Sequence, residues 1–168
     1  MYLCAILPFM KKSRWLIPLE TFLMDFNLLG GLMALLVPDG LMHPYITLTL
    51  HAFVWHFLLL FVGFFIGFSR HGDTSLSGFI KTLPILLICI GAATLLNVLF
   101  HSYGDINMFY ISPFLPMTQR FFKDIAKNLG NPAGILLYIL ASMLGAGIFH
   151  LIWHQVSSHC TGTRSQEP

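Results

Sequence analysis

Four long apolar stretches constrain this chain more than any other feature of its sequence. They run from about residue 15 to 37, 46 to 68, 79 to 100 and 132 to 153. Each has about 20 residues or more, the length that an α-helix needs to cross a hydrocarbon core of about 30 Å. Membrane-spanning strands would be about ten residues long with alternating polarity, and the sequence lacks such alternation. The pattern predicts an all-α fold, a polytopic transmembrane helix bundle with about four full spans.

The charged residues are too few to cover a surface in contact with water. They make up 10% of the 168 residues, whereas 56% are hydrophobic; a soluble domain carries roughly a quarter charged residues. We therefore expect membrane lipids to surround the chain and to be its main partners. The net charge of +2 and the lack of a long basic run argue against nucleic acid as a partner.

The first ten residues are apolar but too short to span a membrane. Positive charge follows them at Lys11, Lys12 and Arg14, whereas a secretory signal peptide carries its positive charge before the apolar run. We expect a partial N-terminal helix, the last turns of a helix whose start is missing, which would make the chain a fragment. A short re-entrant or interfacial segment is the alternative.

Residues 1–154 are expected to form a single helix bundle, and the polar residues 155–168 a disordered tail. The longest connection contains a stretch, about 117–128, that alternates aromatic or aliphatic residues with charged ones. Such alternation favours an amphipathic helix that lies flat on the membrane surface.

Lysine and arginine counts predict the orientation, because cytoplasmic loops carry more of them. One side collects six, which are Lys11, Lys12, Arg14, Arg70, Lys81 and Arg164. The other side collects three, which are Arg120, Lys123 and Lys127. We expect a multi-pass membrane protein with its C-terminus in the cytoplasm.

Gly63 and Gly67 form a GxxxG motif in the second apolar stretch. Small residues at this spacing let two helix backbones approach closely. The motif favours close helix packing inside the bundle. The alternative is that it forms the interface of a homo-oligomer.

Polar residues at membrane depth are costly and often mark a site. The candidates in the apolar stretches are Glu20, Asp25, His51, His56, Asn97 and His101. Each of the two carboxylates can pair with a histidine or an amide. If Glu20, Asp25 and His56 line one water-filled path, they favour a role in transport. His150 and His154 flank Trp153 at the expected cytoplasmic interface, and we interpret them as interfacial anchors.

The three cysteines Cys4, Cys89 and Cys160 are far apart and form no CxxC pair. They predict neither a disulfide framework nor a zinc site, and we expect no metal or other cofactor. Taken alone, Cys4 and Cys89 are typical of small buried apolar residues.

Several short motifs, in order, resemble the YwaF-like integral membrane proteins, bacterial relatives of the transmembrane-protein-164 family. Tyr2-Leu3-Cys4 is similar to that family's "L-H-L-C", with tyrosine where many members have histidine. The stretch from Gly30 to Asp39 resembles "G-x-x-x-A-L-L-x-P-D", and Leu50-His51-Ala52 resembles "S-H-G". A further similar stretch starts at Asn97 and continues through Gly104 to Asn107-Met108-Phe109, and Pro113 and Pro116 fall where the family has a proline-containing loop. The resemblance also implies a bacterial plasma membrane as the location.

The resemblance implies a chemistry, because animal members are described as transferring fatty acyl groups onto lysophospholipids through a cysteine. Cys4 would then be the nucleophile and His51 the base that activates its thiol. Asn97 or Asn107 would hydrogen-bond the developing oxyanion. The rival hypothesis is a non-enzymatic membrane protein, such as a small transporter component or an assembly partner.

Overall fold

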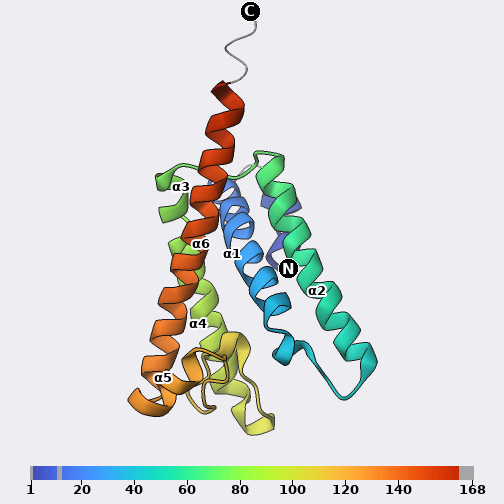
Figure 1. The fold of residues 1–168 in the computed structure, drawn as a ribbon, viewed down its shortest axis with the longest axis vertical. Helices are drawn as coiled ribbons and strands as arrows, with labels where there is room; N and C mark the ends of the chain where they lie inside the picture. Colours follow the sequence, from blue (N-terminus) through green and yellow to red (C-terminus); the bar gives the residue numbers. More distant parts are fainter. Residues whose placement is uncertain (1, 11–12, 163–168) are drawn as a thin grey trace, which may run out of the picture. The chain divides into compact units, whose positions relative to one another are not determined.

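The computed structural model describes residues 2–10 and 13–162, and all regular structure in these two ranges is helical (Figure 1). The α-helices are α1 (Leu16–Leu36), α2 (Ile46–Phe68), α3 (Leu76–Ile80), α4 (Leu83–Phe100), α5 (Phe122–Leu129) and α6 (Asn131–Gly162). Short 3₁₀ turns cover Tyr2–Ala5, Leu7–Met10, Pro38–Leu41, His101–Tyr103 and Met108–Tyr110. The predicted all-α fold is confirmed.

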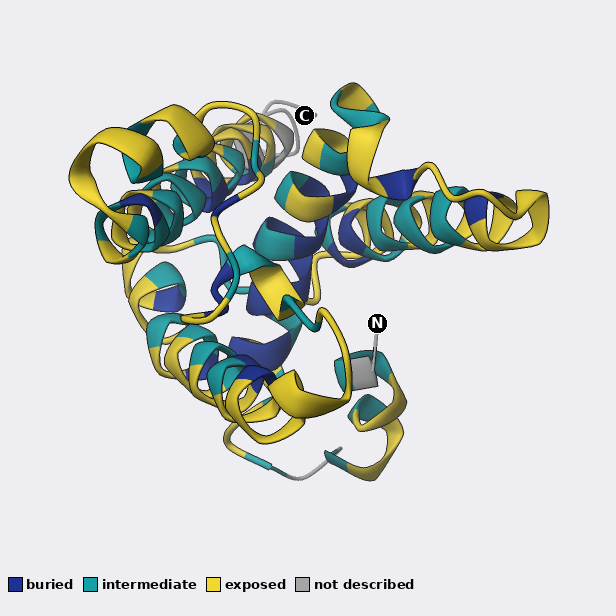
Figure 2. Ribbon diagram, turned by 90° about the horizontal axis from the view of Figure 1, so that it is seen from below, coloured by how far each residue is buried: buried dark blue, intermediate teal, exposed yellow. Residues whose placement is uncertain are grey.

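Four segments are long and apolar enough to cross a membrane, as predicted. They are Leu16–Leu36, Ile46–Phe68, Leu76–Tyr103 and Asn131–His159. Large apolar side chains stay exposed along much of α2 and α4, such as Phe61, Phe65, Leu87 and Ile88. Exposed residues are yellow in Figure 2. An apolar exterior of this extent fits a multi-pass membrane protein whose outer side chains face lipid.

The third span is interrupted, although we expected one continuous helix over about 79–100. Lys81 and Thr82 form a turn between α3 and α4. Pro84 is the second residue of α4, and because proline has no N–H and disfavours helical backbone in the preceding residue, a helix breaks near such a position. The Thr82 hydroxyl donates to the Phe79 carbonyl over 2.7 Å, which partly compensates the interruption.

Three local expectations need adjustment. Residues 2–10 form two 3₁₀ turns, not the end of an α-helix. The amphipathic helix α5 begins at Phe122, later than expected, because Met117 is buried in the preceding loop. Residues 155–162 continue α6, where we expected disorder; residues 163–168 of the expected tail lie outside the described residues.

The helices pack as two compact units. The first unit comprises residues up to Thr82 together with α6 from Gly145 onward, and the second comprises 83–144. Helix α6 thus contributes one part to each unit. The expected single bundle over 1–154 stays a prediction.

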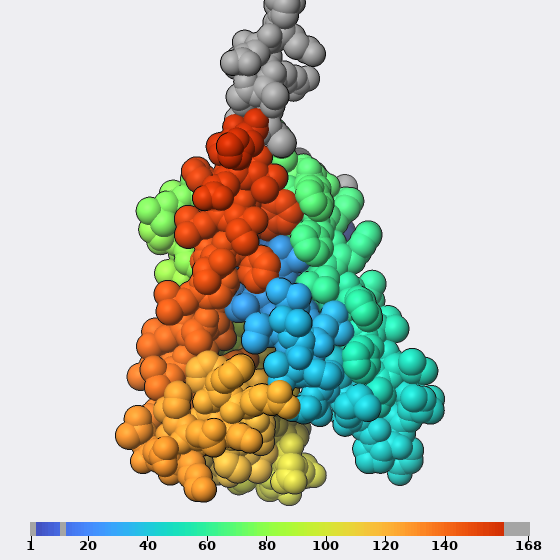
Figure 3. Space-filling model, viewed as in Figure 1, coloured from blue at the N-terminus to red at the C-terminus, as the bar shows by residue number. Residues whose placement is uncertain are grey.

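In the first unit, α1 lies between α2 and the C-terminal part of α6 (Figures 1 and 3). A Cβ atom on Gly63 would lie 2.6 Å from Leu28 Cγ, and one on Gly67 would collide with the Trp153 ring. These glycines therefore let α2 approach α1 and α6, as the packing interpretation expects. A homo-oligomer through Gly63 and Gly67 stays a prediction, and it would have to displace these contacts.

Candidate functional site: a buried aspartate–histidine pair

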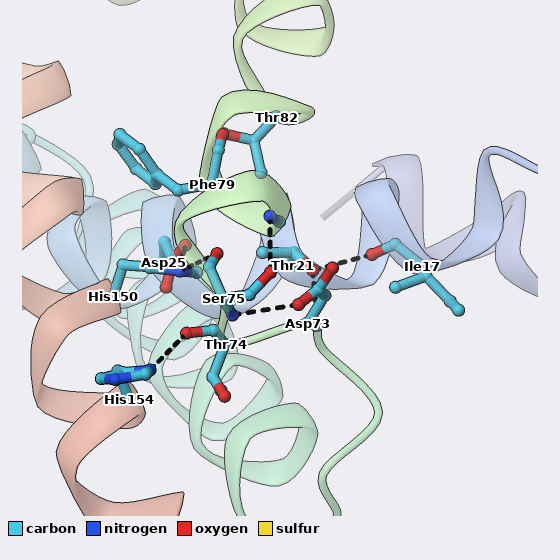
Figure 4. A network of polar contacts seen from close by, with 11 residues as sticks. Ile17, Thr21, Asp25, Asp73, Thr74, Ser75, Phe79, Thr82, His150 and His154 are labelled. Atoms are coloured by element: carbon cyan, nitrogen blue, oxygen red, sulfur yellow. Dashed lines mark hydrogen bonds and ion pairs between the residues drawn. The ribbon is translucent and has the colours of Figure 1, made fainter.

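A carboxylate and a histidine meet in the interior of the first unit (Figure 4). Asp25 lies on α1 with 0% of its surface exposed, and His150 lies on α6 with 3% exposed. His150 Nδ1 is 2.9 Å from Asp25 Oδ2. Both residues belong to segments able to span a membrane, so the pair is at a depth where ionisable groups are costly.

The second ring nitrogen of His150 contacts the backbone that precedes α3. His150 Nε2 is 2.8 Å from the carbonyl oxygen of Ser75. Since a carbonyl oxygen only accepts hydrogen bonds, Nε2 carries a hydrogen and donates it. The Phe79 ring, with its centroid 5.2 Å from that of the imidazole, covers the histidine from α3.

These contacts determine how many protons the pair holds. Besides the Nε2 hydrogen, one proton must lie between Nδ1 of His150 and Oδ2 of Asp25. It makes either an imidazolium with a carboxylate or a neutral imidazole with a carboxylic acid. Both forms have zero net charge, which makes burial of the two groups tolerable.

The backbone beside the pair is attached to both neighbouring helices. The Asp73 N–H donates to Thr21 Oγ1 on α1 over 2.9 Å, and Thr21 in turn donates to the Ile17 carbonyl. On the other side, His154 Nδ1 donates to the Thr74 carbonyl over 3.0 Å. Residues 73–75, which we call the tethered segment, are thus held to α1 and α6.

The tethered segment also starts α3. The Ser75 hydroxyl accepts the Gly78 N–H over 3.1 Å as the N-cap of that helix. Asp73 Oδ1 accepts the Ser75 N–H over 3.0 Å. Serine and aspartate favour such local bonds, which is why the chain turns here before the third span.

Asp73 adds a negative charge to this segment. Burial by itself would raise the pKa of its carboxyl. The hydrogen bonds from Ser75, with the nearby Lys81 ammonium at 4.0 Å and His150, outweigh burial and hold the pKa of Asp73 below its usual value. Asp73 is therefore ionised at neutral pH.

One atom of the pair has no partner. Asp25 Oδ1 is buried and accepts no hydrogen bond from the described residues; the same holds for the donors Asn27 Nδ2 and Trp153 Nε1. A buried unsatisfied polar group costs about 1–3 kcal/mol. Asp25 therefore keeps the capacity to accept one more proton or donor.

Both intramembrane carboxylates pair with a histidine, one of the two partner types expected for them. Glu20 Oε1 lies 3.6 Å from Nδ1 of the exposed His71. Nδ1 of His56 instead donates to the Ala52 carbonyl on its own helix over 2.7 Å. Among the described residues, these contacts do not join Glu20, Asp25 and His56 into one path.

His51 and His56 line the same open pocket of about 270 Å³ beside the start of α2. His43 and Trp55 are also in its wall, and Cys4 is not among the lining residues. Cys4 is half-buried in the first 3₁₀ turn, and in the described part of the chain it has no hydrogen bond to His51. The thiol–imidazole pair stays a prediction.

The two candidate asparagines bind backbone in the second unit. The fully buried Asn97 accepts the Met108 N–H over 2.7 Å and donates to the Met108 carbonyl over 3.1 Å. Asn107 Oδ1 accepts the Ser112 N–H over 2.9 Å. His101 donates to the Val98 carbonyl. These contacts hold a loop together, and the oxyanion role stays untested.

His150 is the site residue that sequence reasoning placed incorrectly. We interpreted it with His154 as an interfacial anchor, but His150 is buried and only His154 is exposed. The spacing of four residues did place both on one face of α6. What the sequence lacked was the partner, because nothing in it shows that this face meets Asp25 on α1.

The arrangement can hold a proton but lacks the parts of a hydrolytic triad. The nitrogen that would activate a nucleophile, Nε2 of His150, faces a carbonyl oxygen. The hydroxyl of Ser75, the residue that carries this carbonyl, serves as a helix cap. No group of three or more histidine, cysteine or acidic side chains able to hold a metal ion occurs among the described residues.

Comparison of the chain with protein-family models, with curated proteins and with solved structures finds no match. The interpretation of the site therefore depends on its geometry alone.

Proposed function

We propose that this chain is a transport protein of the bacterial plasma membrane in which Asp25 and His150 bind and release a proton. The observation that carries the proposal is the 2.9 Å contact between Asp25 Oδ2 and His150 Nδ1 within spanning segments. Ionisable residues in such segments are rare, and in pumps and transporters they form proton relays.

The interrupted third span supports a transport role. Non-helical backbone at membrane depth is tolerated where it is buried in protein or lines an aqueous cavity. Transporters commonly use broken helices at their ion and substrate sites. Here the break at Lys81 and Thr82 directly follows α3, whose Phe79 covers His150.

Proton flux into vesicles tests the proposal directly. The full chain would be reconstituted into liposomes that contain a pH-sensitive dye, and a potassium diffusion potential would drive protons inward. We expect flux above that of empty vesicles, because the pair takes up a proton from one side and releases it to the other. Asp25→Asn should abolish this flux, since an amide does not titrate.

His154→Gln is the matched control. It changes a histidine one turn further along α6 that bonds the same segment but does not contact Asp25. Because a glutamine amide can still donate to the Thr74 carbonyl, the flux of this variant should equal that of the parent protein. Flux no higher than in empty vesicles, or equal flux in Asp25→Asn and parent, would overturn the transport proposal.

Acyl transfer through Cys4 is the alternative implied by the family resemblance, and a separate labelling experiment tests it. A thioester on Cys4 would retain label from a labelled phospholipid through denaturation and lose it to hydroxylamine. Cys4→Ala should then abolish labelling while Cys89→Ala does not, and His51→Ala should slow labelling about 10²–10⁴-fold. Equal labelling of Cys4→Ala and parent would exclude this chemistry.

The orientation is tested by fusing reporters after Pro168. The excess of lysine and arginine on one side supports a cytoplasmic C-terminus. A reporter that is active only in the cytoplasm should therefore work there, and activity of a periplasmic reporter would reverse the orientation.

A further inference from the structure

We propose that loss of the shared proton releases the tethered segment from α6, so that residues 73–75 act as a proton-controlled gate over Asp25. This inference rests on the proposed function, in which the pair exchanges that proton. It assigns a regulatory role to the backbone contact between His150 and Ser75.

The first step is a count of donors. His150 lies between two groups that only accept, the Asp25 carboxylate and the Ser75 carbonyl. With the shared proton in place both contacts are hydrogen bonds. Without it, Asp25 is ionised and the neutral imidazole has a single N–H, so one of the two contacts must fail.

The second step decides which contact fails. A hydrogen bond to a carboxylate is roughly twice as strong as one to a neutral carbonyl, and the difference grows away from water. The remaining hydrogen therefore stays on Nδ1, bonded to Asp25. The lone pair of Nε2 then faces the Ser75 oxygen, and this contact becomes repulsive.

The third step concerns what else holds the segment. The Asp73 N–H stays bonded to Thr21, because no titrating group takes part in that bond. Among the described residues, the hydrogen bond from α6 that still holds the segment is the exposed one between His154 and the Thr74 carbonyl. Thr74 and Ser75 can therefore swing away from α6 about the anchored Asp73. A hydronium ion that enters with water from this side would protonate Oδ1 of Asp25, the buried oxygen that has no partner among the described residues, and leave a water molecule.

The experiment must distinguish the effect of the pair from that of other ionisable groups nearby. On the elements packed around the pair, these are Asp73 and Lys81 before and after α3, His154 on α6, and the Glu20–His71 pair on α1 and after α2. Asp73, whose pKa lies below its usual value, keeps its charge from about pH 6 to about pH 9. Variants of His154 and His71, the other two histidines among these groups, serve as controls.

Hydrogen exchange on the full-length protein in lipid nanodiscs measures the opening. Protection of the amides from Asp73 to Gly78 would be followed from about pH 6 to about pH 9, a range that begins near the ordinary pKa of histidine. Each rate would be divided by the intrinsic rate at the same pH. We expect protection to fall about tenfold as the pH rises, the effect of losing roughly one hydrogen bond.

Asp25→Asn gives the most specific test. An asparagine amide at this position can donate to Nδ1, so the neutral histidine keeps its hydrogen on Nε2 and its bond to Ser75. This variant should therefore stay protected across the whole pH range, whereas a role limited to packing would loosen the segment. In His154→Gln the glutamine amide can still donate to the Thr74 carbonyl but does not titrate. This variant and His71→Gln should therefore keep the pH response of the parent.

Three results would overturn the inference: parent protection that does not change with pH, an Asp25→Asn protein that opens like the parent, or a response lost in His154→Gln or His71→Gln. The vesicle flux experiment is independent. Flux without opening would refute the gate alone, and opening without flux would refute transport while leaving the proton-controlled contact.

Discussion

The two units hold irregular backbone beside their apolar helices with different chemistry. In the first unit, an ionisable pair binds the segment before α3 through a histidine. In the second unit, the loop between α4 and α6 is bound by the asparagines Asn97, Asn107 and Asn131. Both sets give hydrogen-bond partners to backbone groups that lie outside the regular helices.

The asparagine-bound loop is the more completely satisfied of the two. Asn131 at the start of α6 accepts the Met117 N–H over 2.8 Å and donates to the carbonyls of Leu115 and Ser112. An amide offers donors and an acceptor without titrating. The loop can therefore keep its contacts at any pH, whereas the pair in the first unit needs one particular proton.

Asp25→Ala should have the largest effect on stability. It leaves a buried His150 without its partner, and breaking a buried ionic pair in this way costs about 3–5 kcal/mol. Unfolding of the detergent-solubilised protein by denaturant would measure the free energy lost. A loss below about 1 kcal/mol would show that the pair is not buried in the folded protein and would remove the contrast between the units.

Asn97→Ala should destabilise the second unit somewhat less, by about 1–3 kcal/mol. The Met108 N–H and carbonyl would both lose their hydrogen bond to Asn97, and each such bond contributes about 0.5–1.5 kcal/mol. The same denaturant measurement would be repeated between about pH 6 and about pH 9, where asparagine does not titrate. A loss that changes with pH would contradict the amide interpretation.

Gly63→Leu should cost about 1–3 kcal/mol through overpacking against Leu28. The matched control is Gly30→Leu in the same unit, because a Cβ at Gly30 meets nothing within 4 Å. Melting temperatures in detergent would compare both with the parent protein. Equal melting of the two variants would mean that α1 and α2 are not in contact at Gly63.

Asp73→Asn should have the smallest effect, below about 1 kcal/mol at neutral pH, because its ion pair with Lys81 is partly exposed. The folded pKa of Asp73 lies below its unfolded value. Its contribution is therefore complete above the unfolded pKa of about 3.9 and is lost as the pH falls through the folded value. Stability curves of variant and parent should converge in acid, and a gap that widens there would contradict this assignment.

The sequence by itself was enough to predict the all-α fold and the first two spans almost to the residue. The length of each apolar stretch is sufficient for this prediction. A chain in lipid must pair its backbone hydrogen-bonding groups internally, and a helix does so within one segment. The break before α4 was also encoded locally, in Thr82 and Pro84. It was missed because the residues on both sides are apolar and were assigned to one continuous span. Asp25 could be chosen as a candidate because a carboxylate at that depth is costly.

Only the tertiary structure decided what these residues do. Helical periodicity assigns a face to His150, but the partner of that face depends on packing between segments that are 125 residues apart. The same reason applies to Asn97, whose backbone partner lies in an irregular loop, and to Gly63, whose close contact is with α1. Composition and spacing act within one helix, whereas a shared proton requires two atoms brought within 2.9 Å by the fold.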